Sequence, residues 1–160
     1  MRQLGELTVG DYMTHQAIVV DDTRRLTEAI RLMDEEGLSV LPVVDDQKQL
    51  IGILSQSDLI EITHEIQSDI SALNYVTEKT REFLIRLLID QGDTTLVRDV
   101  MTSPVETTTP GLNLVMAAKK LIDRHYHHLP VVDDSGTPIG ILATSDFVRA
   151  FADYGVLLAG

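Results

Sequence analysis

One stretch of this chain occurs twice, and no other feature constrains its fold as strongly. Residues 41–58 and 129–146 share the run Leu-Pro-Val-Val-Asp-Asp, then Ile-Gly-Ile-Leu, then Ser-Asp, at a constant shift of 88 residues. Each copy has an apolar run, a polar turn and a second apolar run, a pattern that predicts two paired strands. The Ser-Asp pair predicts the start of a helix directly after the second strand. We therefore expect a fold with two equivalent halves.

The repetition also covers the residues upstream of this stretch. Asp11-Tyr-Met-Thr14 matches Asp99-Val-Met-Thr102, and apolar residues at helical spacing follow each motif. We expect each repeat to be β-α-β-β-α, with strands at 18–20, 38–44 and 50–54, and at 105–107, 126–132 and 138–142. A repeat this small has little core of its own, so we expect an α/β fold in which both repeats pack sheet to sheet as a pseudo-twofold module. The expected order is repeat one with a lead-in over 1–60, a helical linker over 61–97 and repeat two over 98–160.

The connection between the repeats has an apolar residue at every third or fourth position. These residues are Leu59, Ile62, Ile66, Ile70, Leu73 and Val76, followed by Phe83, Leu84, Leu87 and Leu88. The spacing predicts one long helix, or two helices broken near Asn74, ending at Gly92. The apolar stripe either packs on its own module or forms a coiled-coil-like dimerisation helix, because the pattern is close to a heptad.

Composition excludes several classes of function. The net charge of −12 argues against non-specific nucleic-acid binding, which requires a basic surface. The chain has no cysteine, so disulfides and thiolate chemistry are excluded. Its first residues lack the apolar run of a signal peptide, and no window approaches a membrane span. We expect a soluble cytoplasmic protein that binds neither nucleic acid nor membrane.

The duplicated motifs resemble a tandem pair of CBS domains, also called a Bateman module. The resemblance rests on Asp-x-Met-Thr near each start, Leu-Pro-Val-Val-Asp in the middle and Gly-Ile-Leu-x-x-Ser-Asp at the end, and it covers about 11–60 and 99–150. It implies a regulatory module, not an enzyme, that binds AMP, ADP, ATP or S-adenosylmethionine between its repeats and needs no other cofactor. It also implies a homodimer. Because no enzyme or transporter domain is fused to the module here, the resemblance implies a stand-alone sensor of an unknown regulated protein.

The ribose-binding residues implied by the resemblance are the acidic residues at the start of each last helix, Asp58 and Asp146. A carboxylate can accept two hydrogen bonds from a vicinal diol. Alternatively, these carboxylates only cap their helices together with Ser57 and Ser145. In repeat one, Ser55 would add a hydroxyl to the ribose or phosphate contacts.

The second repeat departs from the family pattern at the position equivalent to Ser55. Ala143 stands there and has no hydroxyl. Thr144 is one position away and would point elsewhere on a strand. We therefore predict unequal sites, of which the one using Asp58 is the better.

The base pocket implied by the resemblance is apolar and uses Ala17 and Leu38 of repeat one and Val105 and Tyr126 of repeat two. Asp58 would serve the pocket of Val105 and Tyr126, and Asp146 that of Ala17 and Leu38. The alternative is that all four side chains belong to the core.

Three of the five histidines lie within His125-Tyr-His127-His128. By resemblance, His127 and His128 would face the phosphate, and affinity would then depend on pH near neutrality. A metal site is the alternative, because His125 and His127 would share one face of a strand, but the sequence offers no third ligand.

Catalysis finds little support in the sequence, which has neither a catalytic triad nor a Gly-rich phosphate loop. Gly52 and Gly140 lie within predicted strands and are expected to be close-packing positions. The rival to the sensor is an interaction module that binds no ligand.

Overall fold

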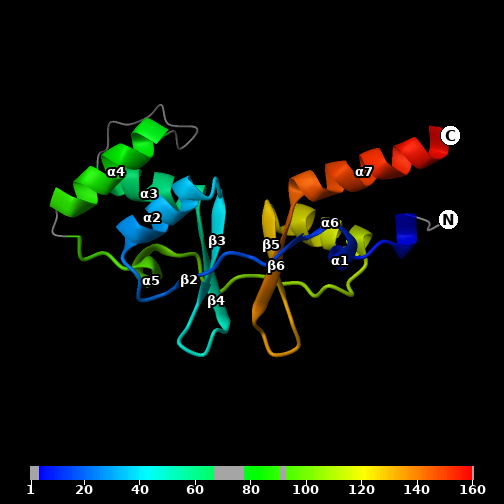
Figure 1. Cartoon of the computed structure of the whole chain (residues 1–160), viewed down its shortest axis with the longest axis horizontal. Helices are drawn as coiled ribbons and strands as arrows, with labels where there is room; N and C mark the ends of the chain where they lie inside the picture. The colour runs from blue at the N-terminus through cyan, green and yellow to red at the C-terminus, as the bar shows by residue number, and fades with distance from the viewer. Residues whose placement is uncertain (1–3, 67–77, 91–92, 160) are drawn as a thin grey trace. The chain divides into compact units, whose positions relative to one another are not determined.

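The computed structural model describes residues 4–66, 78–90 and 93–159, which form two compact units (Figure 1). Unit 1 consists of Met1–Ala17 and Glu106–Gly160, and unit 2 consists of Ile18–Val105. These units do not follow the order of the repeats along the chain. The lead-in of repeat one belongs to the unit of repeat two, and the residues before Glu106 belong to the unit of repeat one.

Unit 2 contains a three-stranded sheet in the order β2-β3-β4. Its strands are β2 (Val20–Asp21), β3 (Val40–Val44) and β4 (Leu50–Ser55), and its helices are α2 (Leu26–Glu35), α3 (Gln56–Ile66), α4 (Glu78–Asp90) and α5 (Val97–Val100). β2 is parallel to β3, and β3 is antiparallel to β4. The apolar faces of the sheet and helices enclose one core.

Unit 1 also contains a three-stranded sheet, in the order β1-β6-β5, but its third strand pairs with the second strand of the hairpin and not with the first. Its elements are η1 (Leu4–Glu6), α1 (Val9–Tyr12), β1 (Thr14–His15), α6 (Leu114–Arg124), β5 (His128–Val132), β6 (Pro138–Ala143) and α7 (Thr144–Ala159). Both pairings, β1 with β6 and β5 with β6, are antiparallel.

The predicted α/β class is confirmed. Within the described residues, no helix has both the length and the apolar content needed to cross a membrane.

The first strand of each repeat is kept short by the proline of the Leu-Pro-Val-Val motif, which lies in the neighbouring strand. Thr108 donates its backbone N–H to the carbonyl of Pro130 over 3.0 Å and accepts from the N–H of Val132 over 2.9 Å. Extending this parallel ladder toward residue 106 would require an N–H from Pro130, which proline lacks. The strand predicted at 105–107 is therefore wrong, because only an isolated bridge forms, between Thr108 and Val131. Pro42 stands in the same place in β3, where β2 begins only at Val20.

The strand predicted at 126–132 begins two residues late because α6 ends in a left-handed residue. His125 has φ 56°, and its N–H donates to the carbonyls of Leu121 and Ile122. Gly37, its equivalent in repeat one, has φ 64°, the conformation in which glycine commonly ends helices. The expectation that His125 and His127 share one face of a strand is wrong, because neither lies in a strand.

The linker contains two helices, α3 and α4, in its described part. Leu59 of α3 and Leu84 of α4 are fully buried in the core of unit 2, and Ile62 packs against the same core. These contacts support the interpretation that the stripe packs on its own module. Outside the described part lie Ile70, Leu73, Asn74, Val76 and Gly92, and also the side chains of Ile66, Phe83, Leu87 and Leu88.

The two strand glycines are close-packing positions, as predicted. A Cβ on Gly52 would lie 2.7 Å from Met101 Sδ and 2.9 Å from the Thr102 carbonyl oxygen. A Cβ on Gly140 would lie 2.6 Å from the carbonyl oxygen of Thr14 and 3.0 Å from Met13 Sδ. Each unit thus receives the Met-Thr pair of the other repeat's first motif, which packs directly on its strand glycine.

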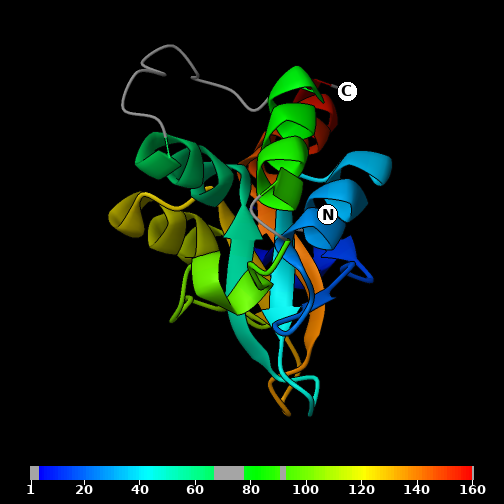
Figure 2. The ribbon, with the colours of Figure 1, turned by 90° about the vertical axis from the view of Figure 1, so that its left-hand side faces the viewer.

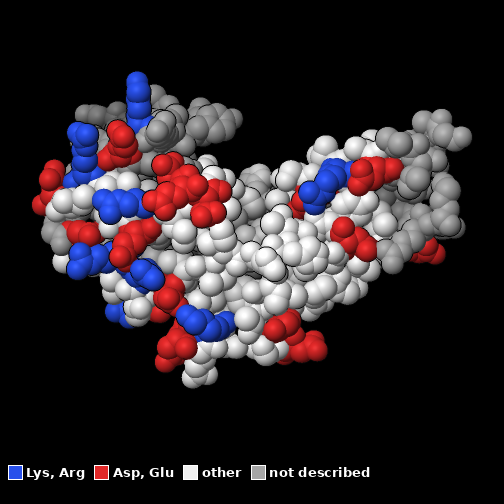
Figure 3. Space-filling model, viewed as in Figure 1, with Lys and Arg blue, Asp and Glu red and all other residues white. Residues whose placement is uncertain are grey.

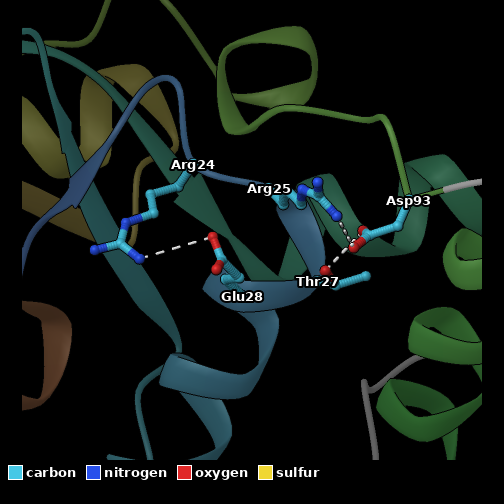
Figure 4. Close-up of polar contacts among 5 residues, drawn as sticks. All are labelled: Arg24, Arg25, Thr27, Glu28 and Asp93. Carbon is cyan, nitrogen blue, oxygen red and sulfur yellow. Dashed lines mark hydrogen bonds and ion pairs between the residues drawn. The ribbon is translucent and has the colours of Figure 1, made fainter.

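A polar cluster fixes the returning segment of unit 2 to the start of α2 (Figure 4). The carboxylate of Asp93 accepts from the hydroxyl of buried Thr27 over 2.7 Å and from Arg25 Nη1 over 3.1 Å. The backbone N–H of Leu26 donates to the carbonyl of Thr95 over 2.9 Å. These bonds hold residues 93–96 beside α2 and so set the path that leads to Met101 and Thr102.

Candidate functional site

Asp58 lies at the junction of β4 and α3, at the third position of the helix. Its Oδ2 accepts from both the backbone N–H and the hydroxyl of Ser55, each over 2.6 Å, and its own N–H lies 3.4 Å from Ser55 Oγ. This reciprocal arrangement is a capping box in which Ser55 is the cap. Ser57, named with Asp58 as a capping residue from the sequence, is instead exposed on the first turn.

A second hydroxyl contacts Asp58 from the Met101-Thr102 segment, which packs on Gly52. Thr102 Oγ1 donates to Asp58 Oδ1 over 2.6 Å. Two backbone bonds, of 2.9 and 3.1 Å, pair Thr102 with Ile53 and hold this hydroxyl in place. Asp58 is only 8% exposed, and its carboxylate lies between two hydroxyls. Because a hydroxyl can both donate and accept, this cluster has the chemistry to hold a diol.

Asp146 occupies the equivalent position in unit 1 but has different neighbours. Its Oδ2 accepts from the Ala143 N–H over 2.7 Å, and its Oδ1 accepts from Arg149 Nη2 over 2.9 Å. The Arg149 guanidinium also donates to the carbonyl oxygen of Tyr12. The equivalent of Arg149 in repeat one is Glu61, so this contact is specific to unit 1.

Sequence reasoning missed both Thr102 and Arg149. Thr102 carried a signal, because it is identical to Thr14 in the repeated first motif. Arg149 also carried one, since it stands three residues after Asp146, within reach on a helix. The sequence could not show which unit each first motif joins, and that pairing decides the neighbour of Asp58.

The four predicted base-pocket residues are divided between the units. Leu38 and Val105 belong to unit 2, and both are half-buried, with Leu38 packed against the core. Ala17 and Tyr126 belong to unit 1, where Ala17 is half-buried and Tyr126 is 39% exposed. The packing of Leu38 against the core agrees with the alternative that it is a core residue. Contact with a base stays a prediction for all four residues.

The two histidines predicted at the phosphate lie near the start of α7. His127 is exposed, and its carbonyl accepts from the backbone N–H of Thr144 over 3.1 Å. Thr144 is the first residue of α7, so the expectation that it lies on a strand is wrong. His128 is half-buried opposite Ala143, and this burial, with the neighbouring charge of His127, lowers its pKa.

The alternative of a metal site gains no support from the described part of the chain. No three or more His, Cys, Asp or Glu side chains gather there in a way that could hold a metal ion. His125 is exposed at the end of α6 and is not brought next to a third ligand by a strand.

Both repeats of this chain are similar to known proteins. The family model of the CBS domain matches residues 9–65 and 97–153. The chain is 34% identical over 152 residues to CBSX2, a chloroplastic CBS domain-containing protein of Arabidopsis thaliana, with 91% of this chain but only 64% of CBSX2 covered. It is 32% identical over 157 residues to the uncharacterized protein MJ1426 of Methanocaldococcus jannaschii, which covers 91% of this chain and 92% of that protein.

A solved structure of the plant relative is similar in fold. The crystal structure of CBSX2 in complex with AMP matches with a TM-score of 0.70 and 31% identity. The match covers 92% of this chain and 98% of that chain. AMP is thus bound by a relative whose crystallised chain is covered almost completely by the match.

Proposed function

This chain belongs to the CBS domain family, of which it carries two copies, and we propose that it is a regulatory module that binds an adenosyl ligand. The observation that carries this proposal is the nearly buried Asp58 carboxylate flanked by the hydroxyls of Ser55 and Thr102. Two hydroxyls and a carboxylate can satisfy both hydroxyls of a ribose. The AMP complex of CBSX2, at 31% identity, supports the same ligand class.

In this proposal, Asp58 binds the ribose better than Asp146 does. Two hydroxyls that can reorient surround Asp58, whereas Asp146 is held by a guanidinium. The other proposed contacts are to the ligand's base and phosphate. They comprise base contacts by Ala17, Leu38, Val105 and Tyr126, phosphate contacts by His127 and His128, and further polar contacts by Ser57 and Thr144.

The proposed action is regulatory and not catalytic. Ligand occupancy would be relayed to a separate protein, and the chain would act as a homodimer. Exposed apolar side chains on α6 and α7 support self-association. Location in the cytoplasm stays a prediction, and CBSX2 is a chloroplastic relative.

Calorimetric titration of the full chain with AMP, ADP, ATP and S-adenosylmethionine tests the ligand proposal. Asp58→Asn should weaken binding by about 10- to 100-fold, because hydrogen bonds to a charged group contribute about 1.5–3 kcal/mol. Asp46→Asn is the matched control, since Asp46 is an exposed carboxylate in the β3–β4 turn and should bind as the wild type does. Binding by none of the four ligands, or unchanged binding by Asp58→Asn, would refute the proposal.

A second function, an interaction module without ligand, is favoured by one specific observation. Both oxygens of Asp58 already accept hydrogen bonds, from Ser55 and Thr102, so the buried carboxylate is satisfied without any ligand. The same titrations separate the two functions. Absence of heat with every ligand, together with persistent self-association, would favour the interaction module.

A further inference from the structure

The segment 93–102 carries the Thr102 hydroxyl to the candidate site and is bonded to the start of α2 on its way. The backbone N–H of Val97 donates to the carbonyl of Arg24 over 2.9 Å, and the N–H of the next residue donates to the carbonyl of Asp22 over 3.0 Å. Val97 is also fully buried in the core of unit 2. The position of Thr102 therefore depends on how firmly this segment is attached to α2.

The first residue of the segment, Asp93, is held in an unfavourable backbone conformation by two side-chain bonds. Its φ is 47°, in the left-handed region that costs free energy for a residue with a side chain. Its carboxylate accepts from the hydroxyl of Thr27 and from Arg25, as Figure 4 shows, and Thr27 is only 2% exposed. Without these bonds nothing in the cluster would offset the strain, and the start of the segment would relax.

Unit 1 contains an equivalent segment that lacks this attachment. At the shift of 88 residues, Gly5 and Val115 replace the aspartate and the threonine, so neither the carboxylate nor the hydroxyl is present. The backbone attachment is retained, since the N–H of Val9 donates to the carbonyl of Leu112 over 2.9 Å. The side-chain cluster is therefore an addition to unit 2.

The two segments also differ at their far ends. Thr14, the equivalent of Thr102, pairs with Ile141 on the strand of unit 1. Among the described residues of that unit, however, the Thr14 hydroxyl makes no bond to Asp146, whose oxygens accept from other donors. The unit whose segment is anchored by a carboxylate is thus the unit whose terminal threonine bonds the candidate ribose-binding residue, Asp58.

The carboxylate of the cluster comes from the linker. Asp93 lies between the two stretches, 9–65 and 97–153, that match the CBS domain model. It follows the end of α4 by three residues, and α4 lies against α2 with its Leu84 fully buried in the core of unit 2 (Figure 2). A residue outside both matched stretches is thus bonded to the first long helix of repeat one.

We propose that the cluster of Asp93, Thr27 and Arg25 sets the affinity of this module for its adenosyl ligand. The cluster fixes the start of the returning segment, and the segment in turn holds the Thr102 hydroxyl against Asp58. The three residues are positioning residues, because they act through Thr102 and not by contact with the ligand. This inference rests on the proposed function and extends its site to residues of the linker and of α2.

Calorimetric titration with AMP tests the role of the Thr27 hydroxyl. Thr27→Val removes the hydroxyl and keeps the shape of the side chain, and it should weaken AMP binding by about 3- to 30-fold. Thr27→Ser keeps the hydroxyl and should bind AMP as the wild type does. Val115 stands at the equivalent position of α6, so a valine is compatible with this helix, and the variant should keep the wild-type circular dichroism spectrum.

A second pair of variants tests the carboxylate. Asp93→Asn should weaken AMP binding in the same direction, because it removes the charge that pairs with Arg25. Asp90→Asn is the matched control, since Asp90 is exposed at the end of α4. Charged side chains of both signs crowd the face of unit 2 seen in Figure 3, and the loss of one exposed charge among them should leave the affinity unchanged.

A double-mutant cycle shows whether the cluster acts through Thr102. Thr102→Val removes the hydroxyl that contacts Asp58 and should weaken AMP binding by itself. In that background Thr27→Val should cause no further loss, because the contact that the cluster positions is already absent. Losses that multiply in the double variant would show that the cluster affects binding by another route, and the proposal would be overturned.

Hydrogen exchange gives a readout that needs no ligand. Thr27→Val should speed exchange of the Thr102 N–H, which donates to the carbonyl of Ile53 over 2.9 Å, and Thr27→Ser should not. Unchanged exchange at Thr102, or unchanged AMP affinity in Thr27→Val, overturns this inference and leaves the proposed function intact. A wild type that binds no adenosyl ligand refutes the proposed function and the effect on affinity, while faster exchange in Thr27→Val would still establish the positioning of Thr102.

Discussion

Replacement of Thr108 by valine should stabilise the protein. Thr108 is 4% exposed, and its Oγ1 has no hydrogen-bond partner among the described residues. Its backbone is fixed by the bonds to Pro130 and Val132, so the side chain cannot leave the interior without breaking them. The equivalent residue in repeat one is Val20, which is 5% exposed, and this shows that the fold accepts a valine at this position.

The size of the effect follows from the unpaired hydroxyl. A buried polar group left without a partner costs about 1–3 kcal/mol, and valine has nearly the same shape as threonine. We expect Thr108→Val to raise the free energy of unfolding by about 1 kcal/mol, the lower end of this range. For a chain of this length, that gain corresponds to a rise in melting temperature of about 2–4 °C.

Urea denaturation followed by circular dichroism measures this change. The wild type, Thr108→Val and Thr109→Val should have the same denaturant slope, so that midpoints can be compared directly. Thr109 is the exposed neighbour and its replacement should leave the midpoint unchanged. A Thr108→Val variant no more stable than the wild type would show that the hydroxyl makes a favourable contact, and the reasoning would fail.

Two further predictions concern the strand glycines and the polar cluster at α2. Gly140→Ala should destabilise unit 1 by about 1–3 kcal/mol, because the added Cβ would meet the carbonyl oxygen of Thr14. Gly111→Ala is the control and should leave stability unchanged, because the space around Gly111 is open. Equal urea midpoints for the two variants would contradict the close fit at Gly140. The hydroxyl of Thr27, followed by Arg25, lowers the pKa of Asp93. The resulting stabilisation is fully present above about pH 4 and is lost as the pH falls through the lowered pKa. Asp93→Asn should therefore be less stable than the wild type at neutral pH, and its stability should approach that of the wild type in acid. A stability difference between the two proteins that does not change with pH would contradict this assignment.

Much of each unit could be predicted from local sequence. The apolar runs around the turns fixed the pairs β3–β4 and β5–β6, and helical spacing located α2 and α6. The exchange of the first motifs between units could not be predicted. Both motifs end in Met-Thr and both strands carry Ile-Gly-Ile-Leu, so either motif makes the same contacts on either strand. Identical sequences give no local preference, and the choice depends on the path of the connecting segments.

The overpredicted strands have a different cause. β-Branched residues at 18–20 and at 105 and 107 favour extended backbone and so predict strands. Strand length, however, depends on the donors of the neighbouring strand. Pro42 and Pro130 stand in the strands beside them and offer no N–H, so the ladders cannot extend toward the start of the chain. The limiting residue was visible in the sequence, but its effect required the pairing register.

Unequal binding by the two candidate sites was predicted from Ser55 and Ala143 and stays a prediction, for which the hydrogen-bond partners of the two carboxylates add a second reason. Both carboxylates accept the N–H of the residue that precedes their helix, so that contact does not distinguish them. What distinguishes them is the partner of the second oxygen, which is the hydroxyl of Thr102 for Asp58 and the guanidinium of Arg149 for Asp146. A ribose hydroxyl can replace or share a neutral hydroxyl with little electrostatic loss, whereas displacing the guanidinium separates an ion pair at a carboxylate that is only 5% exposed. The argument for the Asp58 site therefore depends on Thr102 at least as much as on Ser55.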